Sequence, residues 1–373
     1  MIRIFKRWLG QDRRESAVFE IVCGGNTSAL NVIILTEHIN ATYYINFDIP
    51  LRNLHKRKSI NFAVASQKHV AASKRWQEPA EEFKPDVIIL TRYSEEGGRE
   101  ILANFKRKGI PLIYHIDDDL LAVPESLGNE ILMQHGSEEV VNTRHYLLQN
   151  CDLIYASTQV LAGLMKQRFP SQHVVHGICA LYMGKELTLS VPRSGNDQVI
   201  GYMGSKGHQK DLELVVPALE RLLEERRELK FEVFGTIKIP DALERFGPRV
   251  RRYSVQTNYA DFIATLANMN WSIGLAPLDN VPFNQCKTPT KFVEYTACGI
   301  AVIASRISVY EEAIPKNGGW LVDSDWYATI KHVLDHPIER QKAVLTAQNY
   351  CAVKYDAEIL EQQILDITQN VIS

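Results

Sequence analysis

The feature that most constrains the fold is an alternation of strand-like and helix-like segments that runs through the chain and is interrupted once. Short runs rich in β-branched residues alternate with segments of helical spacing, which is typical of βαβ units and a mainly parallel sheet. From about 183 to 198 the sequence turns to Gly, Lys, Ser, Pro, Asn and Asp without apolar periodicity, which predicts a linker. Because 373 residues suffice for two cores, we predict two α/β domains.

The first half contains apolar strand-like runs that end in polar or glycine turns. PDVIILTRY (85–93) is typical of a buried strand, and IPLIYHIDDDL (110–120) of a strand that ends in acidic residues. We expect strands at 19–25, 41–49, 60–66, 85–93, 110–120, 151–158 and 173–180, and helices at 28–40, 99–109, 140–150 and 159–169.

The second half repeats the alternation. The segment 211–228 carries Leu and Val at helical spacing, so we expect one long helix that faces the core. We expect strands at 198–205, 230–236, 270–278, 300–305 and 320–324, a helix at 290–299 and a helical C-terminal stretch. The predicted domains are 1–185 and 186–350, followed by a C-terminal helix at 351–373.

Composition excludes several classes of protein. The formal net charge of −2 gives no electrostatic reason to expect nucleic acid as a partner. The six cysteines are scattered without a CxxC pair, which indicates neither a zinc site nor a disulfide framework and fits a reducing compartment. No apolar run reaches the roughly 18 to 20 residues of a membrane-spanning helix.

The basic start, residues 1–14, carries apolar residues but is too short and too charged for a signal peptide. Two interpretations stay open: a solvated arm or packed helix, and a short amphipathic helix on an anionic bilayer. We therefore expect a cytoplasmic protein, with the inner face of the membrane as the alternative location.

The most informative stretch is PLDNVPFNQCKTPTKFVEYTACGIAVIAS (277–305). Lys287, Thr288 and Lys291 lie where a polar loop enters a helix, and a helix N-terminus favours an anion such as a diphosphate. Glu294 lies three residues after Lys291 on the same helical face, so a lysine near phosphate and a carboxylate near ribose could serve one nucleotide. The alternative is a solvated loop with capping threonines.

A second cationic turn follows the strand 198–205. Glycine allows the backbone to approach phosphate closely, and lysines neutralise phosphate without a metal ion. The predicted donor-binding residues in this turn are Gly204, Ser205, Lys206, His208 and Lys210. A lone Gly-Ser-Lys turn is weak evidence. However, this turn precedes the loop at Lys287 by about 80 residues, and both the turn and the loop follow predicted strands.

These motifs resemble those of glycosyltransferase family 4, the glycosyl transferases group 1, on the GT-B fold. KFVEYTACGIAVIAS matches the family's nucleotide-binding helix and strand, with Ala301 where proline is usual. Glu294 matches the second of two family glutamates, and Cys286 stands where the first would be. Lys210 takes the place of the family's lysine over the diphosphate, and Ser205 or Lys206 that of its arginine.

The resemblance also implies roles in the first domain. Gly24, Gly25 and Asn26 match the family's glycine-rich first turn, on the acceptor or sugar side. Asp117 and Asp118, at the end of a strand, would orient a donor hydroxyl or receive the acceptor proton. The run of three aspartates leaves a divalent metal open as the alternative, as in the DxD motif of the GT-A class.

The resemblance implies a GT-B fold, with two Rossmann-like domains, a cleft between them, and a C-terminal helix at 351–373 that crosses back onto the first domain. It implies retaining transfer of a sugar from a nucleotide diphosphate sugar to a glycan or lipid-linked acceptor, without a metal or other cofactor, in bacterial surface polysaccharide or glycan assembly. Two alternatives stay open: a non-hydrolysing sugar-nucleotide epimerase, and a non-catalytic nucleotide-sugar-binding domain, the latter because of Cys286 and the missing arginine.

Overall fold

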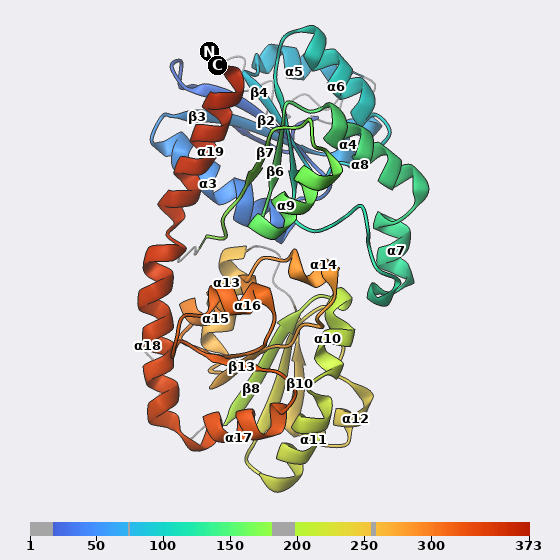
Figure 1. The fold of residues 1–373 in the computed structure, drawn as a ribbon. Helices are drawn as coiled ribbons and strands as arrows, with labels where there is room; N and C mark the ends of the chain where they lie inside the picture. Colours follow the sequence, from blue (N-terminus) through green and yellow to red (C-terminus); the bar gives the residue numbers. More distant parts are fainter. Residues whose placement is uncertain (1–17, 74, 181–197, 255–258) are drawn as a thin grey trace. The chain divides into compact units, whose positions relative to one another are not determined.

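The computed structural model describes residues 18–73, 75–180, 198–254 and 259–373, which divide into two compact α/β units (Figure 1). The N-unit comprises the described residues of Met1–Ala122, Gln134–Ile178 and Ala357–Ser373, and the C-unit those of Val123–Met133 and Cys179–Asp356. Segment 1–14 and all but the last residue of the predicted linker lie outside the described residues. No helix in the described ranges is long and apolar enough to cross a membrane.

The described residues of the N-unit form a seven-stranded sheet in the order β1-β3-β2-β4-β5-β6-β7. All pairs are parallel except β1 with β3, which is antiparallel. Every residue of β3, β4 and β5 is buried, as expected for strands covered on both faces. The strands are β1 (Ile21–Cys23), β2 (Leu30–Thr36), β3 (Ile60–Ser66), β4 (Val87–Thr91), β5 (Leu112–Ile116), β6 (Leu153–Ala156) and β7 (Val174–His176).

Helices surround this sheet, and the C-terminal helix is one of them. The helix α19 packs against α3, where Asn53 Nδ2 donates to Glu361 Oε1 at 2.7 Å and Arg57 pairs with Glu361 at 3.1 Å. The helices are α2 (Ala41–Tyr43), the π-helix η1 (Tyr44–Asp48), α3 (Ile49–Lys56), α4 (Gln67–Ala72), α5 (Gln77–Phe83), α6 (Gly98–Arg107), α8 (Glu138–Asn150), α9 (Gln159–Arg168) and α19 (Ala357–Ile372).

Two predicted elements at the start of the N-unit are wrong. The expected helix at 28–40 is the strand β2, which lies between β3 and β4, so its apolar run is covered on both faces. The expected strand at 41–49 is helical instead. Asn40 caps it by accepting from the Tyr43 N–H at 3.3 Å, and its buried residues Tyr43, Phe47 and Leu51 recur every fourth position.

The described residues of the C-unit form a six-stranded sheet in the order β10-β9-β8-β11-β12-β13, and every pair is parallel. The strand β10 was not predicted, because three of its four residues are exposed and its sequence VRRY lacks an apolar run. The strands are β8 (Val199–Gly204), β9 (Lys230–Gly235), β10 (Val250–Tyr253), β11 (Ile273–Ala276), β12 (Ala301–Ser305) and β13 (Trp320–Val322).

The long helix predicted at 211–228 is broken in the structure. The helix α10 ends at Glu213 and α11 begins at Val216, because Pro217 has no N–H to donate to the carbonyl four residues earlier. The helices of this unit are η2 (Glu125–Leu127), α7 (Asn129–His135), which begins in this unit, η3 (Lys206–His208), α10 (Gln209–Glu213), α11 (Val216–Glu225), α12 (Asp241–Glu244), η4 (Gly247–Arg249), α13 (Tyr259–Asn268), α14 (Pro282–Gln285), α15 (Thr290–Ala297), α16 (Ser308–Ala313), α17 (Trp326–Asp335) and α18 (Pro337–Lys354).

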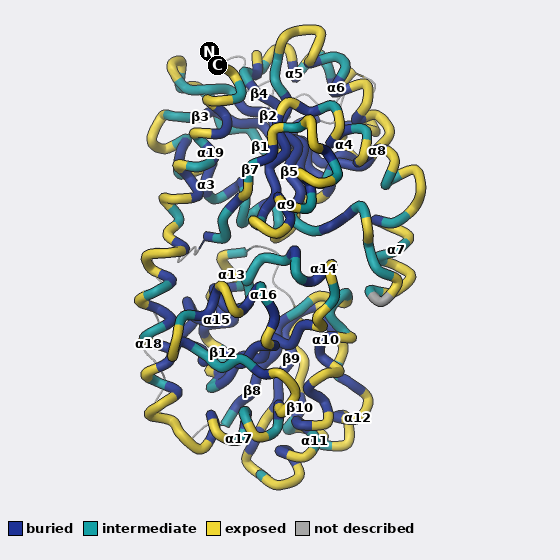
Figure 2. The backbone as a smooth tube through the Cα atoms, viewed as in Figure 1, coloured by how far each residue is buried: buried dark blue, intermediate teal, exposed yellow. Residues whose placement is uncertain are grey.

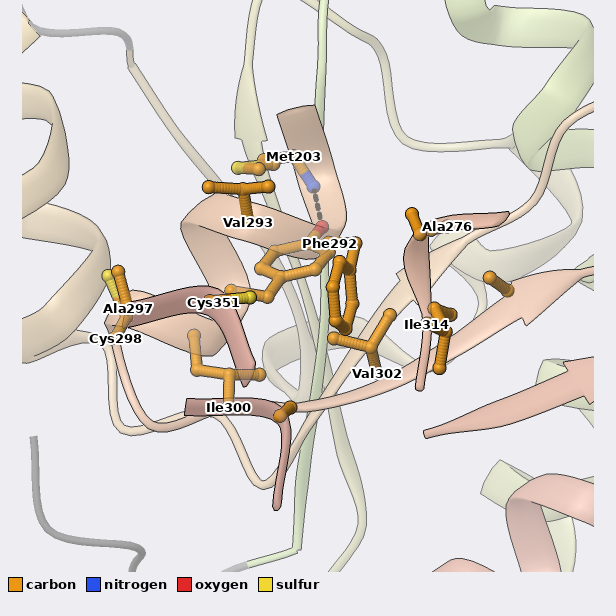
Figure 3. Packing of buried hydrophobic residues seen from close by; sticks show 14 of the residues in the cluster. Met203, Ala276, Phe292, Val293, Ala297, Cys298, Ile300, Val302, Ile314 and Cys351 are labelled. Carbon is orange, nitrogen blue, oxygen red and sulfur yellow. Dashed lines mark hydrogen bonds between the residues drawn. The ribbon is translucent and has the colours of Figure 1, made fainter. Parts of the chain in front are cut away.

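The core of the C-unit fixes α15, the helix that carries Lys291. Figure 2 shows that the strands consist largely of buried residues, drawn in dark blue. Figure 3 shows Phe292 and Val293 of α15 packed with Val302 of β12 and Cys351 of α18. The Tyr295 hydroxyl accepts from the Met203 N–H at 2.8 Å, which ties α15 to the end of β8. The start of α15 is thereby held at the carboxyl edge of the sheet.

Candidate functional site

The ends of β8 and β9 form the tightest backbone approach at the C-unit edge. Gly235 has a φ of 134°, and a Cβ at this position would lie 2.1 Å from the carbonyl oxygen of Gly204. Only glycine fits such a contact. The Lys206 N–H donates to Thr236 Oγ1 at 3.2 Å and fixes the following turn. The predicted donor turn at Gly204–Lys206 is therefore a firmly held loop at the carboxyl end of two parallel strands.

His208 and Asp211 connect this turn to the loop after β11. His208 Nδ1 lies 2.8 Å from Asp211 Oδ2, and Asp211 Oδ1 accepts from the Asp279 N–H at 3.0 Å. Burial, with the nearby positive charges of Lys291 and Lys287, lowers the pKa of His208 to about 3, although Asp211 opposes this shift. His208 is therefore a neutral imidazole at neutral pH, next to two lysines.

The two lysines of the predicted donor loop lie against aromatic rings. Lys291 Nζ lies 5.6 Å from the centroid of the Tyr202 ring, and Lys287 Nζ lies 4.8 Å from that of Phe283. Burial, together with the charge of Lys287, lowers the pKa of Lys291 to about 8, although the charge of Asp211 opposes this shift. The Thr288 and Thr290 hydroxyls are 2.8 Å apart at the start of α15.

Glu294 is buried on the next turn of α15. Its Oε1 accepts from the Tyr259 hydroxyl at 2.8 Å. Burial raises the pKa of Glu294 to about 7, against the opposing effects of Tyr259 and Lys291. Cys286, four residues before the helix begins, is also buried. The position that the resemblance assigns to a first glutamate therefore holds a small thiol in the protein interior.

The structure brings some of the predicted donor residues together and leaves others at the surface. Lys287 and Lys291 are near enough to lower the pKa of His208, and Lys287 also lowers that of Lys291. Lys210 and Ser205 are exposed, and Lys206 is also exposed, with its Nζ 3.5 Å from Glu130 Oε2. The central group therefore consists of the two lysines Lys287 and Lys291 beside the neutral His208, with Lys206 and Lys210 outside it.

The carboxyl edge of the N-unit sheet carries a different arrangement, centred on Glu37. Glu37 follows β2 and pairs with Arg92 at 3.1 Å, Arg144 at 3.2 Å and His135 at 3.3 Å. Burial alone would raise the pKa of Glu37, but these three partners lower it. Glu37 and Arg144 are both buried, so the carboxylate and its cations compensate one another in the interior.

Arg92 extends this network to Asp117. Arg92 Nη1 lies 3.3 Å from Asp117 Oδ2, and the Thr42 hydroxyl donates to the same oxygen at 3.0 Å. Arg92 has a φ of 55°, a left-handed conformation that costs free energy for a residue with a side chain. The ion pairs with Glu37 and Asp117 hold it there, and they raise the pKa of its guanidinium although burial lowers it.

The three aspartates after β5 point to different partners. Asp117 meets Arg92 and Thr42, whereas Asp119 is buried and forms a bidentate pair with Arg168, one contact of which measures 2.9 Å. Asp118 is partly exposed. One aspartate of the triplet is thus structural through Arg168, and Asp117 and Asp118 stay as the candidates for chemistry.

The predicted acceptor turn at Gly24–Asn26 does not connect a strand to a helix; it lies between the strands β1 and β2. Because β1 is antiparallel to β3, with Cys23 opposite Phe62, the turn lies beside the start of β3. The Asn26 N–H donates to Asn61 Oδ1 at 3.2 Å at this amino edge. Ligands of parallel sheets bind at the carboxyl edge, so the position of this turn opposes a ligand role.

Several residues at these edges were not predicted. Glu37, Arg92 and Thr42 organise Asp117, and Tyr259 orients Glu294. A signal for Arg92 was available, since a charged residue directly after a buried apolar run marks the carboxyl end of a strand. Glu37 had no such signal as long as 28–40 was interpreted as a helix.

Comparisons with solved structures show which fold the chain shares. HepE from Anabaena, in complex with UDP and glucose, has a TM-score of 0.64 and 15% identity over 91% of this chain and 100% of that chain. Sucrose-phosphate synthase from Thermosynechococcus elongatus has a TM-score of 0.66 and 12% identity over 92% and 99%. WaaG, a glycosyltransferase involved in lipopolysaccharide biosynthesis, has a TM-score of 0.62 and 12% identity over 90% and 99%. The predicted GT-B fold is confirmed.

Residues 197–336 match the family described as glycosyl transferases group 1. This range contains the Gly204 turn and the loop at Lys287. No curated protein matches the chain. The group 1 glycosyltransferase resemblance that the motifs predict is confirmed for residues 197–336, and the chain shares the fold of these solved glycosyltransferases.

Proposed function

We propose that the protein transfers a sugar from a nucleotide diphosphate sugar to an acceptor hydroxyl, without a metal ion and with retention of anomeric configuration. The observation that carries this proposal is the pair of lysines, Lys287 and Lys291, with the neutral His208 beside the Gly204 turn. Burial is the main cause that lowers the pKa of Lys291, and the charge of Lys287 adds to this effect, although Asp211 opposes it. A diphosphate would stabilise the charged form of both lysines.

The nucleotide would extend from this group along α15. Lys291 and Glu294 lie one helical turn apart, and Tyr259 holds Oε1 of Glu294. A ribose hydroxyl would donate to Oε2 while the phosphates meet Lys291 and the start of the helix. The HepE structures contain UDP with glucose and UDP-glucose, which supports a nucleotide sugar as the class of ligand.

In the reaction, the bond from the sugar C1 to the phosphate oxygen breaks and a bond from C1 to the acceptor oxygen forms. The acceptor proton passes to the departing phosphate or to a carboxylate, for which Asp117 and Asp118 are the candidates. Lysine charge at the diphosphate stabilises the leaving group. Retention, in this scheme, follows from attack on the same face that the diphosphate leaves.

The proposed acceptor is a glycan or a lipid-linked glycan of a bacterial surface polysaccharide. WaaG, whose fold is similar, acts in lipopolysaccharide biosynthesis, which supports this class of acceptor. The basic, apolar composition of residues 1–14 supports contact with the inner face of the membrane, on the cytoplasmic side. Sedimentation with anionic vesicles, compared for the full chain and a variant without residues 1–14, tests that contact.

A thermal-shift screen of nucleoside diphosphates and their sugars, with and without EDTA, tests the donor site. At 100 times its Kd, the correct nucleotide should stabilise the fold by about 2.7 kcal/mol, insensitive to EDTA. Lys291→Ala should weaken nucleotide binding by about 2 kcal/mol, or about 30-fold, and Glu294→Ala by a similar amount. Lys342→Ala, at an exposed lysine of α18, is the matched control and should bind as the wild type does. Binding that requires manganese would refute metal independence.

Product analysis tests the chemistry. With donor and acceptor, NMR of the product should show the anomeric configuration of the donor. With donor alone, an epimerised nucleotide sugar would identify an epimerase, and tight nucleotide-sugar binding without turnover on any acceptor would identify a binding domain. An inverted anomeric centre would overturn retention and leave sugar transfer standing.

A further inference from the structure

Two histidines and a glutamate gather at the corner between α17 and α18. His332 Nε2 lies 2.9 Å from Glu339 Oε2, and the rings of His332 and His336 stack with centroids 4.1 Å apart. One possible ligand atom from each of the three side chains lies within 4.8 Å of the other two. All three residues are exposed, so solvent can complete a coordination sphere.

The orientation of His336 favours ligation. Its Nδ1 lies 2.7 Å from the carbonyl oxygen of His332, so Nδ1 carries the proton and Nε2 carries the lone pair. Metal-bound histidines typically donate from their other ring nitrogen to a carbonyl in this way. His332 Nε2 donates to Glu339 Oε2, and a cation between these two atoms would replace that proton.

The surrounding corner is fixed. Asp335, beside His336, pairs with Arg226 and with Lys331, each at 2.6 Å. Arg226 also donates to Gln198 at 3.4 Å, immediately before β8 begins. These contacts place the corner at the amino edge of the C-unit sheet, whereas the Gly204 turn lies at the carboxyl end of β8. The histidine corner is therefore separate from the proposed donor site.

We propose that His332, His336 and Glu339 bind one divalent transition-metal ion, with Zn²⁺ as the reference ion and water in the remaining position. Two imidazoles and a carboxylate are a ligand set that Zn²⁺ accepts, and ligand atoms in a tetrahedral zinc site lie about 3.3 Å apart. The present ligand atoms lie within 4.8 Å of one another, so the exposed side chains must rotate to close this spacing. The ion would join the end of α17 to the start of α18 and stabilise the corner.

Calorimetric titration of the full chain with zinc chloride tests this site. The wild type should bind at this corner at neutral pH and lose this binding at acidic pH, because protonated imidazoles do not coordinate. His336→Ala and Glu339→Gln should each weaken it by about tenfold or more. His173→Ala, at an exposed histidine of the N-unit, is the control and should leave the isotherm unchanged. The same isotherm for the wild type and His336→Ala, or no zinc binding by the wild type, would overturn the proposal.

This test is independent of sugar transfer. Nucleotide binding by His336→Ala should equal that of the wild type, with and without EDTA. If EDTA lowers the melting temperature of the wild type but not that of His336→Ala, the lost metal belongs to the histidine corner. An equal loss of melting temperature in both proteins would contradict this assignment.

Discussion

The two parallel sheets carry charged groups at their carboxyl edges, but the charges are balanced in one and not in the other. At the N-unit edge, Glu37 meets Arg92 and Arg144 within 3.2 Å, and Arg92 also meets Asp117. At the C-unit edge, Lys287 and Lys291 lie near a neutral His208, and the pKa of Lys291 is lowered. The first edge compensates its own charges, and the second gains from an incoming anion.

From this difference we infer different functions for the two edges. A self-compensated network holds a carboxylate such as Asp117 in one position and changes little when a neutral ligand arrives. An edge with crowded cations is unfavourable by itself and becomes favourable with a diphosphate. The comparison predicts that changes at the N-unit edge alter turnover or folding, and that changes at the C-unit edge alter nucleotide affinity.

The largest expected effect is that of Asp117→Asn on turnover. The amide keeps the contacts with Thr42 and Arg92 but cannot take up a proton, so kcat should fall by about 10³-fold with nucleotide affinity unchanged. Release of nucleoside diphosphate measures kcat, and calorimetry measures affinity. Asp366→Asn, on the exposed face of α19, is the control. A loss of nucleotide affinity equal to the loss of kcat would remove the distinction between the edges.

Glu37→Gln should lower the free energy of unfolding by about 3 kcal/mol, because it leaves the buried Arg144 and the partly buried Arg92 without a full counter-charge. The pKa of Glu37 is lowered in the folded protein, so its stabilising effect is present above its ordinary pKa of 4.5 and is lost as the pH falls below it. Urea unfolding at pH 7 and pH 4 measures both effects. Glu358→Gln, at an exposed pair with Arg57, should cost less than about 1 kcal/mol. Equal losses in both variants would contradict a buried network.

The smallest effect is a pH dependence of nucleotide binding. The pKa of Lys291 is lowered to about 8, so the charged form that binds phosphate is present below that pH and is lost above it. Affinity should therefore fall by about tenfold between pH 7 and pH 9. Calorimetry at the two pH values measures it. Lys291→Arg stays charged over this range and should flatten the dependence; an unchanged slope would exclude Lys291 as its source.

The sequence predicted the C-unit better than the N-unit, for a physical reason. Pro217 aside, the segments of the C-unit carry clear periods, and β8, β9, β11 and β12 fall within the predicted strands. In the N-unit, the apolar run within 28–40 was also compatible with a helix, and the aromatic helix at 41–49 was also compatible with a strand. The strand order settles the first case, and strand order depends on contacts between segments distant in sequence.

The candidate site was predictable where its residues are close in sequence. Lys287, Lys291 and Glu294 share one loop and helix, and spacing alone brings them together. Glu37, Arg92 and Asp117 lie after three different strands, so only the topology of the sheet brings them together. Burial by the packed core lowers the pKa of Lys291, which the spacing of residues does not reveal.

The short antiparallel strand β1 has a consequence for solubility. Its three residues pair with β3, in which all seven residues are buried. Without β1, the backbone donors and acceptors along one side of the apolar strand β3 would lose their partners, and such an edge recruits strands from other molecules. We therefore expect the three residues of β1 to limit aggregation, and a chain that begins after Cys23 to aggregate more readily.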